Sequence, residues 1–295
     1  MITVTEAIER RANLTSQEFK SNYVELQKPV IISGMQNNWI GLKQWSLDYL
    51  RQTSPSLKIY AKKFDNSRHI KLCNFTLQEY IRLIQQYEQS SQKSALPPYC
   101  HDLPLFSLVP SLIEDVLPFP LDYLPQWYRH KWWRYSQFFI GSSNSITPLH
   151  FDCLLTNNIF FQIVGRKQFT ILLPEDAKFC YRHGWRWFKV DPENPDLNRY
   201  PDYKNASPIK FIVNPGDILY MPPGTLHHVR SLEPSVSFNI DWHTKESSLN
   251  ALSAITKGIP AKNSYYNLLL AMGLVLKVPP QIIFKFYKSY LNYVS

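Results

Sequence analysis

The feature that most constrains the fold is a series of short β-rich runs between Trp132 and Trp242. Val, Ile, Phe and Tyr dominate these runs, and turns rich in Gly, Pro and Asn separate them. Roughly eight such runs in succession are typical of a β-sandwich or barrel. They are WWRYSQFFIG, HFDCLL, NIFFQIVG, KQFTILL, IKFIV, DILYMP, LHHVRSL and SVSFNIDW. The sequence therefore predicts a mainly β core over residues 132–242.

The segments on either side of this core mix helices with strands. Before it, helices are expected at Leu14–Leu26, Trp45–Thr53 and Thr76–Gln89, strands at KPVIISGM and LKIYAKK, and an irregular connector at Ala95–Pro110. After it the pattern is helical, and Ile282–Val294 has apolar side chains on one face. This face must be buried against the body of the protein, a second subunit or a membrane surface.

The net charge of +9 favours acidic peptides, nucleic acid or an anionic membrane surface as partners. A solvated basic surface without a specific partner explains the same number. The densest cationic run, Tyr128–Tyr135, interleaves aromatic rings with cations, which suits either stacking on nucleic-acid bases or a strand edge with buried rings.

The cysteines indicate the compartment. Cys73, Cys100, Cys153 and Cys180 show no C-x-x-C spacing, which favours reduced thiols over a disulfide framework. The N-terminal MITVTEAIERR lacks the apolar centre of a signal peptide, and the longest apolar run, Leu268–Leu276, is too short for a membrane span. We therefore expect a cytoplasmic protein with no transmembrane segment.

Three polar side chains suggest a metal site. If HFDCLL is a strand, His150 and Asp152 project from the same face, although such a pair arises often by chance. A later strand carries His227 and His228, and strand alternation lets only one of them face the interior. Two histidines and one carboxylate form the facial triad that suits non-haem Fe(II).

The chain resembles the JmjC or cupin-like family of Fe(II)- and 2-oxoglutarate-dependent hydroxylases. The resemblance covers Lys28–Trp242 and rests on ordered motifs: TPLHFD, NIFFQIVGRKQFTILLPEDA, FKVDPENPDLNRYPDYKNA, NPGDILYMPPGTLHHV and SVSFNIDW. It is greatest to the small hydroxylase branch that includes an asparaginyl hydroxylase and the tRNA wybutosine hydroxylase. It implies a double-stranded β-helix (jelly-roll or cupin) core with N-terminal α/β elements and C-terminal helices. Residues 1–246 would form the catalytic domain, and residues 247–295 a helical extension that pairs two subunits.

The resemblance also implies roles for single residues. The metal ligands would be His150, Asp152 and His227, and Lys167 would hold the far carboxylate of 2-oxoglutarate. The other matching positions are Thr147 and Tyr99 at that carboxylate, Asn158 near the cosubstrate and Asn239 near the iron. Each has a structural alternative: a turn residue for Thr147 and Asn158, a strand amide for Asn239, core packing for Tyr99 and a surface lysine for Lys167. Asn157 competes with Asn158 as the inward amide.

The expected function is hydroxylation of a protein or peptide side chain, with succinate and CO2 as co-products. A tRNA or small-molecule substrate, a non-catalytic cupin-like scaffold, and a zinc or manganese isomerase or lyase remain alternatives. Substrate identity does not carry over. Where the asparaginyl hydroxylase has bulky tryptophans before the distal histidine, this chain has Gly224, Thr225 and Leu226, and its tryptophan near the last strand is displaced to Trp242. The loop His183–Ala206 either borders the entrance or is pinned by its own aromatic rings.

Overall fold

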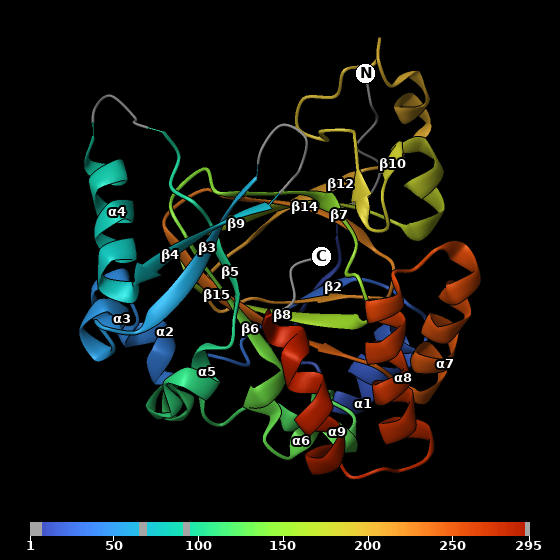
Figure 1. The fold of residues 1–295 in the computed structure, drawn as a ribbon, viewed down its shortest axis with the longest axis horizontal. Coiled ribbons are helices and arrows are strands. Elements are labelled where there is room, and N and C mark those ends of the chain that lie inside the picture. The colour runs from blue at the N-terminus through green and yellow to red at the C-terminus, as the bar shows by residue number, and fades with distance from the viewer. Residues whose placement is uncertain (1–7, 65–69, 91–94, 293–295) are drawn as a thin grey trace.

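Two facing β-sheets form the centre of the molecule (Figure 1), which we describe from a computed structural model covering residues 8–64, 70–90 and 95–292. One sheet has the strand order β1-β2-β13-β8-β15-β6-β5, and the other has the order β10-β11-β7-β14-β9-β12. The core strands are β6 (Ser136–Gly141), β7 (Ile146–His150), β8 (Asn157–Val164), β9 (Lys167–Leu172), β12 (Ile209–Val213), β13 (Ile218–Met221), β14 (Leu226–Ser231) and β15 (Ser235–Trp242). Their antiparallel pairing across two sheets is a jelly roll, as expected.

Two of the expected strands have different bounds. The run HFDCLL is not a strand beyond His150, because the chain turns there and Leu155 N–H donates to the Asp152 carbonyl over 2.9 Å. Residues 132–135 form a 3-10 helix, in which the Trp132 ring stacks on Phe119 with centroids 3.6 Å apart. The strand geometry assumed for His150 and Asp152 is therefore wrong, and their convergence needs another explanation.

Strand alternation along β15 separates the apolar core from a polar interior. Phe238 lies in the core, with ring centroids 4.7 Å from Phe161 and 5.0 Å from Phe138. Ser237, Asn239 and Asp241 project from the opposite face, toward the second sheet. The two sheets thus enclose a space with polar side chains, and this space positions the site.

The N-terminal segment extends the first sheet. It contributes β1 (Arg10–Ala12), α1 (Ser16–Phe19) with a π-helical turn at Lys20–Val24, β2 (Val30–Ser33), α2 (Ile40–Gln44), α3 (Leu47–Thr53), the β3–β4 pair (Lys58–Phe64 and Ile70–Thr76) and α4 (Leu77–Gln89). The α4 helix begins with a capping box in which Thr76 accepts from Glu79 N–H. The elements α1, α3, α4, β2 and β3 lie where helices and strands were expected, whereas β1, α2 and β4 were not predicted.

The connector at Ala95–Pro110 is not irregular, contrary to expectation. It contains β5 (Cys100–Leu103), which pairs with β6 at the sheet edge, and α5 (Leu105–Leu108). The backbones of Tyr99 and Lys62 exchange hydrogen bonds of 2.7 and 2.8 Å, which fixes this segment beside β3. Its many prolines masked the short strand in the sequence.

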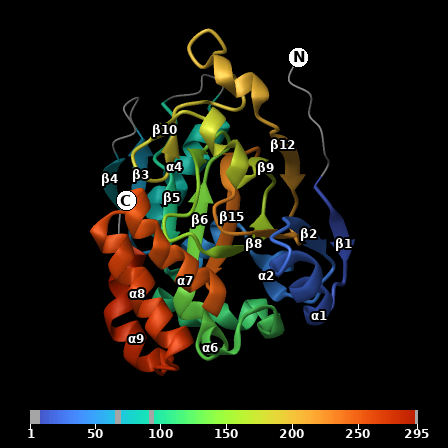
Figure 2. The same cartoon turned by 90° about the vertical axis from the view of Figure 1, so that its right-hand side faces the viewer.

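The C-terminal helices lie against one side of the sheets, opposite β1 and α1 (Figure 2). They are α7 (Lys245–Ser253), α8 (Ala261–Val275) and α9 (Pro280–Tyr287), followed by a 3-10 turn at Lys288–Asn292. The helix expected at Ile282–Val294 is thus shorter, and its last two residues lie outside the described range. Its buried face, with Ile283 and Tyr287, belongs to the main hydrophobic core.

The remaining elements are short. They are α6 (Gln126–Arg129), β10 (Arg182–His183), β11 (Trp187–Phe188) and 3-10 turns at Pro110–Val116, Leu121–Tyr123, Trp132–Tyr135, Pro174–Phe179, Pro201–Asn205 and Ala254–Lys257. All four cysteines are free thiols, as expected. Within the described ranges, no helix combines the length and apolar character that a membrane crossing requires.

Candidate metal centre and its pocket

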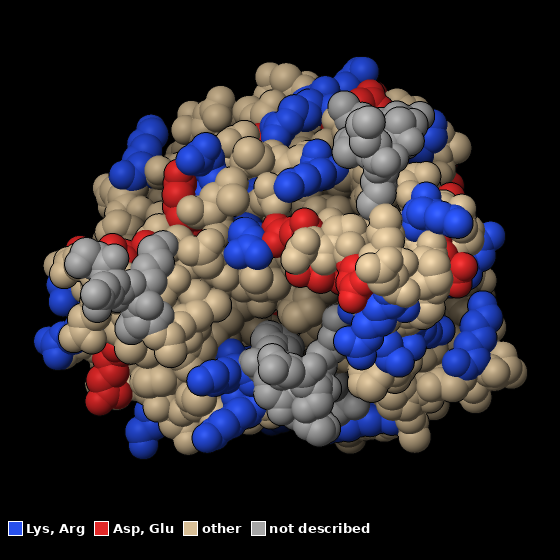
Figure 3. Space-filling model, turned by 90° about the horizontal axis from the view of Figure 1, so that it is seen from above, with Lys and Arg blue, Asp and Glu red and all other residues tan. Residues whose placement is uncertain are grey.

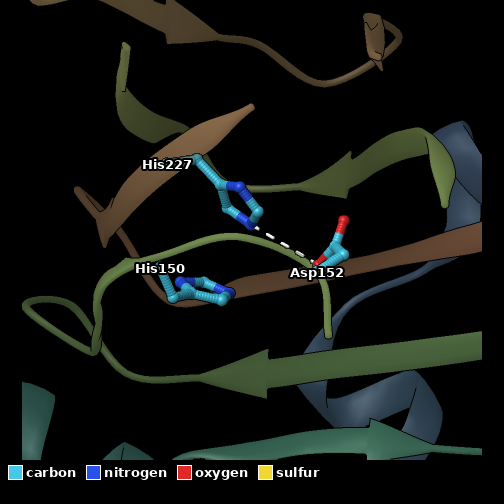
Figure 4. Close-up of side chains that lie close together, drawn as sticks. All are labelled: His150, Asp152 and His227. Atoms are coloured by element: carbon cyan, nitrogen blue, oxygen red, sulfur yellow. Dashed lines mark ion pairs between the residues drawn. The ribbon is translucent and has the colours of Figure 1, made fainter. Parts of the chain in front are cut away.

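Three side chains, two from neighbouring strands and one from the turn after the first strand, converge in the space between the sheets (Figure 4). His150 is the last residue of β7, and its backbone pairs in register with His227 on β14. Asp152 lies in the turn after β7, which brings its carboxylate back toward both rings. One ligand atom from each residue lies within 4.8 Å of the other two, and His227 Nε2 is 3.8 Å from Asp152 Oδ1.

Hydrogen bonds to backbone carbonyls orient the two imidazole rings of this group. Nδ1 of His150 lies 2.8 Å from the Pro148 carbonyl, and Nδ1 of His227 lies 3.1 Å from the Thr225 carbonyl. Because a carbonyl can only accept, each Nδ1 carries the proton and each Nε2 presents a lone pair. Burial and the adjacent His227 ring hold the pKa of His150 well below its ordinary value, so this imidazole is neutral.

The donor set fits a divalent transition metal. Asn158 Nδ2 donates to Asp152 Oδ2 over 2.9 Å, which turns Oδ1 toward His227 and fixes the carboxylate. Two imidazole nitrogens and one carboxylate oxygen on one side of an ion are the ligands that non-haem Fe(II) takes, with its other positions left to small molecules.

His228 faces the opposite side of β14, as strand alternation requires. Its Nε2 is 3.9 Å from Asp191 Oδ1, and Glu193 lies in the same group. Glu193 already accepts hydrogen bonds from the Arg230 guanidinium and the Gln168 amide. A guanidinium that neutralises this carboxylate disfavours a cation there, so we interpret the group as a salt-bridge network.

Lys167, at the start of β9, is a buried ammonium without a counter-ion. Its side chain is 1% exposed, and Nζ donates to Tyr99 Oη and Ser237 Oγ over 2.8 Å each. Rings of Tyr99, Phe139 and Phe160 surround it at 5.3 to 5.5 Å. Within the described residues no carboxylate lies within 4.0 Å of Nζ, and burial lowers the pKa of Lys167 to about 7. This position suits an anion.

All the residues singled out by the resemblance line one pocket. They are Tyr99, Thr147, His150, Asp152, Asn158, Lys167, His227 and Asn239. Asn158 is the inward amide of its pair, whereas Asn157 accepts from Tyr220 Oη on the other face of β8. Asn239 Nδ2 donates to Asp241 Oδ1 over 3.1 Å. The structure therefore brings these residues together, while their roles stay a prediction.

The sequence interpretation missed further residues in this pocket. Asp241 lines the pocket and follows the same alternation as Asn239, as does Ser237, which accepts a hydrogen bond from Lys167, so SVSFNIDW contained their signal. Burial, then the neighbouring Asp152, raise the pKa of the Asp241 carboxyl well above its ordinary value. Arg186 and Tyr290 also line the pocket, but no sequence pattern pointed to either.

The loop His183–Ala206 was expected either to border the site or to be pinned by its own aromatic rings, and different parts of it do each. Arg186 lies at the pocket, and the Trp187 ring centroid is 5.0 Å from that of His150. Farther along, Phe188 and Tyr203 are buried in a second hydrophobic cluster that pins the loop. The β10–β11 hairpin therefore forms one wall of the site.

A jelly roll with an inward two-histidine, one-carboxylate group is the arrangement of a cupin whose side chains could hold a metal ion. The sequence profile described as the cupin-like domain matches residues 16–248, and the chain belongs to this family. Several of the proteins that it resembles are named JmjC domain-containing proteins.

Three relatives illustrate the similarity. Lysine-specific demethylase 8 of Danio rerio is 31% identical over 250 residues, covering 77% of this chain and 56% of the relative. JmjC domain-containing protein D of Dictyostelium discoideum is 28% identical, covering 75% and 52%. tRNA wybutosine-synthesizing protein 5 of Mus musculus is 24% identical, covering 80% and 77%. The chain spans about half the length of the first two.

Proposed function

We propose that this protein is an Fe(II)- and 2-oxoglutarate-dependent dioxygenase that hydroxylates a protein or peptide side chain, with succinate and CO2 as co-products. The observation that carries the proposal is the pairing of two features in one pocket. His150, Asp152 and His227 present a facial metal-ligand set, and Lys167 presents a buried cation with no partner carboxylate in the described chain. A metal together with an anionic cosubstrate accounts for both features.

The residues of the chain would hold and orient the reactants. Bound Fe(II) would supply the activation of O2. Lys167 and Tyr99 would bind the far carboxylate of 2-oxoglutarate, with Thr147 on the neighbouring wall. Asn158 keeps Asp152 oriented, and Phe160 with other aromatic rings excludes water from the cation. Asn239 would lie beside the metal.

We rank the possible substrate classes by what the names of the relatives say. The name of the Danio rerio relative refers to lysine demethylation, which places a protein substrate first. The name of the Mus musculus relative refers to tRNA, which comes second. Figure 3 shows acidic and basic side chains interspersed over one face, instead of a single basic patch for nucleic acid. A cytoplasmic location stays a prediction from the sequence.

Two alternative functions would not require a buried cation at Lys167. A zinc or manganese isomerase or lyase does not require an anion clamp beside the metal. A scaffold without catalysis requires neither the ligand set nor the cation. The buried Lys167 therefore favours the dioxygenase over both.

The test supplies purified protein with Fe(II), 2-oxoglutarate and O2 and measures succinate and iron binding. We expect slow succinate release without substrate, and no iron binding in Asp152→Ala. Glu246→Gln, which alters an exposed carboxylate on α7, serves as the control and should behave as the wild type. Iron affinity unchanged in Asp152→Ala, or a wild-type protein that binds neither iron nor 2-oxoglutarate, would refute the proposal.

A further inference from the structure

Asp241 is a buried carboxyl group for which the described protein supplies no cationic partner within 4.0 Å. The residue is 7% exposed, and among the described residues its carboxyl group accepts a side-chain hydrogen bond from the neutral Asn239 amide alone. No Lys, Arg or His nitrogen of the described residues lies within 4.0 Å of it. Burying a carboxylate without a cation is unfavourable, so the arrangement suggests a ligand that supplies one.

The other carboxylates of the pocket already have partners. Asp102 accepts from the Lys62 ammonium and contacts His101 Nδ1 at 2.9 Å. Asp152 belongs to the metal-ligand group. Asp241 is therefore the described pocket carboxyl group that is open to a bound molecule, and a cation bound there would favour its ionised form.

The position of Asp241 places such a molecule beside the metal ligands. Asp241 pairs in register with Asn158 on β8, and Asn158 donates to Asp152 over 2.9 Å. Paired strand residues have Cα atoms about 4.5 to 5.5 Å apart. A group bound by Asp241 would therefore lie next to the metal centre.

The pocket has a basic group near one end and an acidic group near the other. Ser237, which contacts Lys167, and Asp241 are four residues apart on the same face of β15, or roughly 13 Å along the strand. An anionic cosubstrate is attracted to Lys167, and it would be repelled by an ionised Asp241. The end at Asp241 prefers a cation.

We propose that Asp241 selects the substrate by binding a cationic side chain, a guanidinium or an ammonium group. This inference rests on the proposed function and names the substrate class of that site. Hydrogen bonds between such a cation and a carboxylate are among the strongest in proteins. The net charge of +9 favours acidic partners, and both preferences are met by a cationic residue within an acidic stretch of peptide.

Arg186 is the rival partner for Asp241 within the chain. It lines the same pocket, and its Nε is buried without a hydrogen-bond partner in the described residues. Its guanidinium instead lies 4.4 Å above the Trp187 ring centroid. If Arg186 left this ring to pair with Asp241, the pocket would be neutral and would not select a cation. The experiment separates these arrangements.

The experiment uses the full chain with Mn(II) in place of Fe(II), together with 2-oxoglutarate. The probes are pools of capped heptapeptides with random flanking residues and a fixed central arginine, lysine, citrulline or norleucine. Citrulline and norleucine are neutral residues of similar shape. Broadening of the central side-chain methylene proton signals by Mn(II) in NMR titrations gives the affinity next to the metal.

We expect the arginine or lysine pool to bind at least about tenfold more tightly than its neutral counterpart. Asp241→Asn should remove this preference while Mn(II) and 2-oxoglutarate binding persist, and Glu246→Gln should keep it. Equal binding of cationic and neutral pools, or an intact preference in Asp241→Asn, overturns the inference. The inference is also overturned if the wild type shows no preference for cationic pools and only the Arg186→Gln variant does. Tighter binding of bulk tRNA than of every peptide pool overturns it as well.

The same samples distinguish failure of the inference from failure of the proposed function. Mn(II) binding is followed by electron paramagnetic resonance, and 2-oxoglutarate binding by calorimetry. If both bind and no cationic pool is preferred, only the role of Asp241 fails. If neither binds, the dioxygenase proposal fails and the substrate inference fails with it.

Discussion

Lys167 Nζ donates a hydrogen bond to Tyr99 Oη over 2.8 Å, joining β9 to the segment that precedes β5. The phenol orients the ammonium but carries no charge to neutralise it. Burial accordingly lowers the pKa of Lys167 to about 7. The protein therefore maintains an anion site whose charge depends on pH within the ordinary working range.

The first prediction concerns the proton balance of 2-oxoglutarate binding. Free Lys167 is mostly neutral at pH 8, and a bound carboxylate raises its pKa by favouring the charged form. Binding at pH 8 should then take up roughly 0.9 proton, and affinity should fall as pH rises above about 7. Calorimetry of the Mn(II)-loaded protein in buffers of different ionisation enthalpy measures this uptake.

Lys167→Arg provides the control for that prediction, because a guanidinium does not lose its proton in proteins. This variant should bind 2-oxoglutarate with no uptake attributable to residue 167. An equal uptake in Lys167→Arg and the wild type would show that another group takes the proton.

The second prediction uses the adjacent histidines of β14, which face opposite ways. His227→Gln should weaken Mn(II) binding by more than about 100-fold, since it removes a ligand instead of a supporting contact. His228→Gln alters the outer salt-bridge network, which lies on the opposite side of β14 from the metal ligands. It should therefore change the metal affinity by no more than about threefold, the size of effect usual for residues outside a site. Titration monitored by paramagnetic resonance measures both, and circular dichroism checks folding. Similar losses in the two variants would contradict the ligand assignment.

The alternating pattern of the core explains why much of the site was predictable. In SVSFNIDW the apolar and polar residues alternate, and the structure buries them on opposite faces of β15. The same rule correctly allowed only one of His227 and His228 to face the interior. Asp241 followed the rule too but was missed, because the resemblance supplied no role for it.

Other parts of the site depend on contacts between distant segments. Asp152 was expected on a strand, but the carboxylate reaches the centre through a turn that strand alternation does not describe. Arg186 and Tyr290 reach the pocket only after the β10–β11 hairpin and the C-terminal helices have packed. Local propensity contains no information about such packing.

The third prediction concerns stability at the start of α4. Thr76 Oγ1 accepts from Glu79 N–H over 3.2 Å, and Glu79 accepts in return from Thr76 N–H over 2.7 Å. Thr76→Ala removes the cap and should lower the free energy of unfolding by about 1 kcal/mol. Thr53→Ala is the control, because the Thr53 hydroxyl only returns to the Tyr49 carbonyl within α3. Urea denaturation measures both, and an equal loss in the two variants would argue against the capping box.

The fourth prediction concerns the C-terminal helices, for which we propose the pairing of two subunits. Ile282 and Phe286 are 49% and 54% exposed on α9, and Leu268 on α8 is 50% exposed. The opposite side of α9, with Ile283 and Tyr287, is already buried in the protein's own core. An exposed apolar surface on two adjacent helices favours association with a second copy.

Wild-type protein should therefore be a dimer by light scattering, and Phe286→Glu should shift it to monomer by placing a charge in the apolar contact. Leu197→Glu, at a 42% exposed position in the loop before β12, is the matched control and should remain dimeric. Tyr290 joins the same segment to the pocket, so Mn(II) affinity is measured alongside to show that the variant keeps its site. A wild-type protein that stays monomeric at high concentration would leave the α9 face without a partner and refute the pairing.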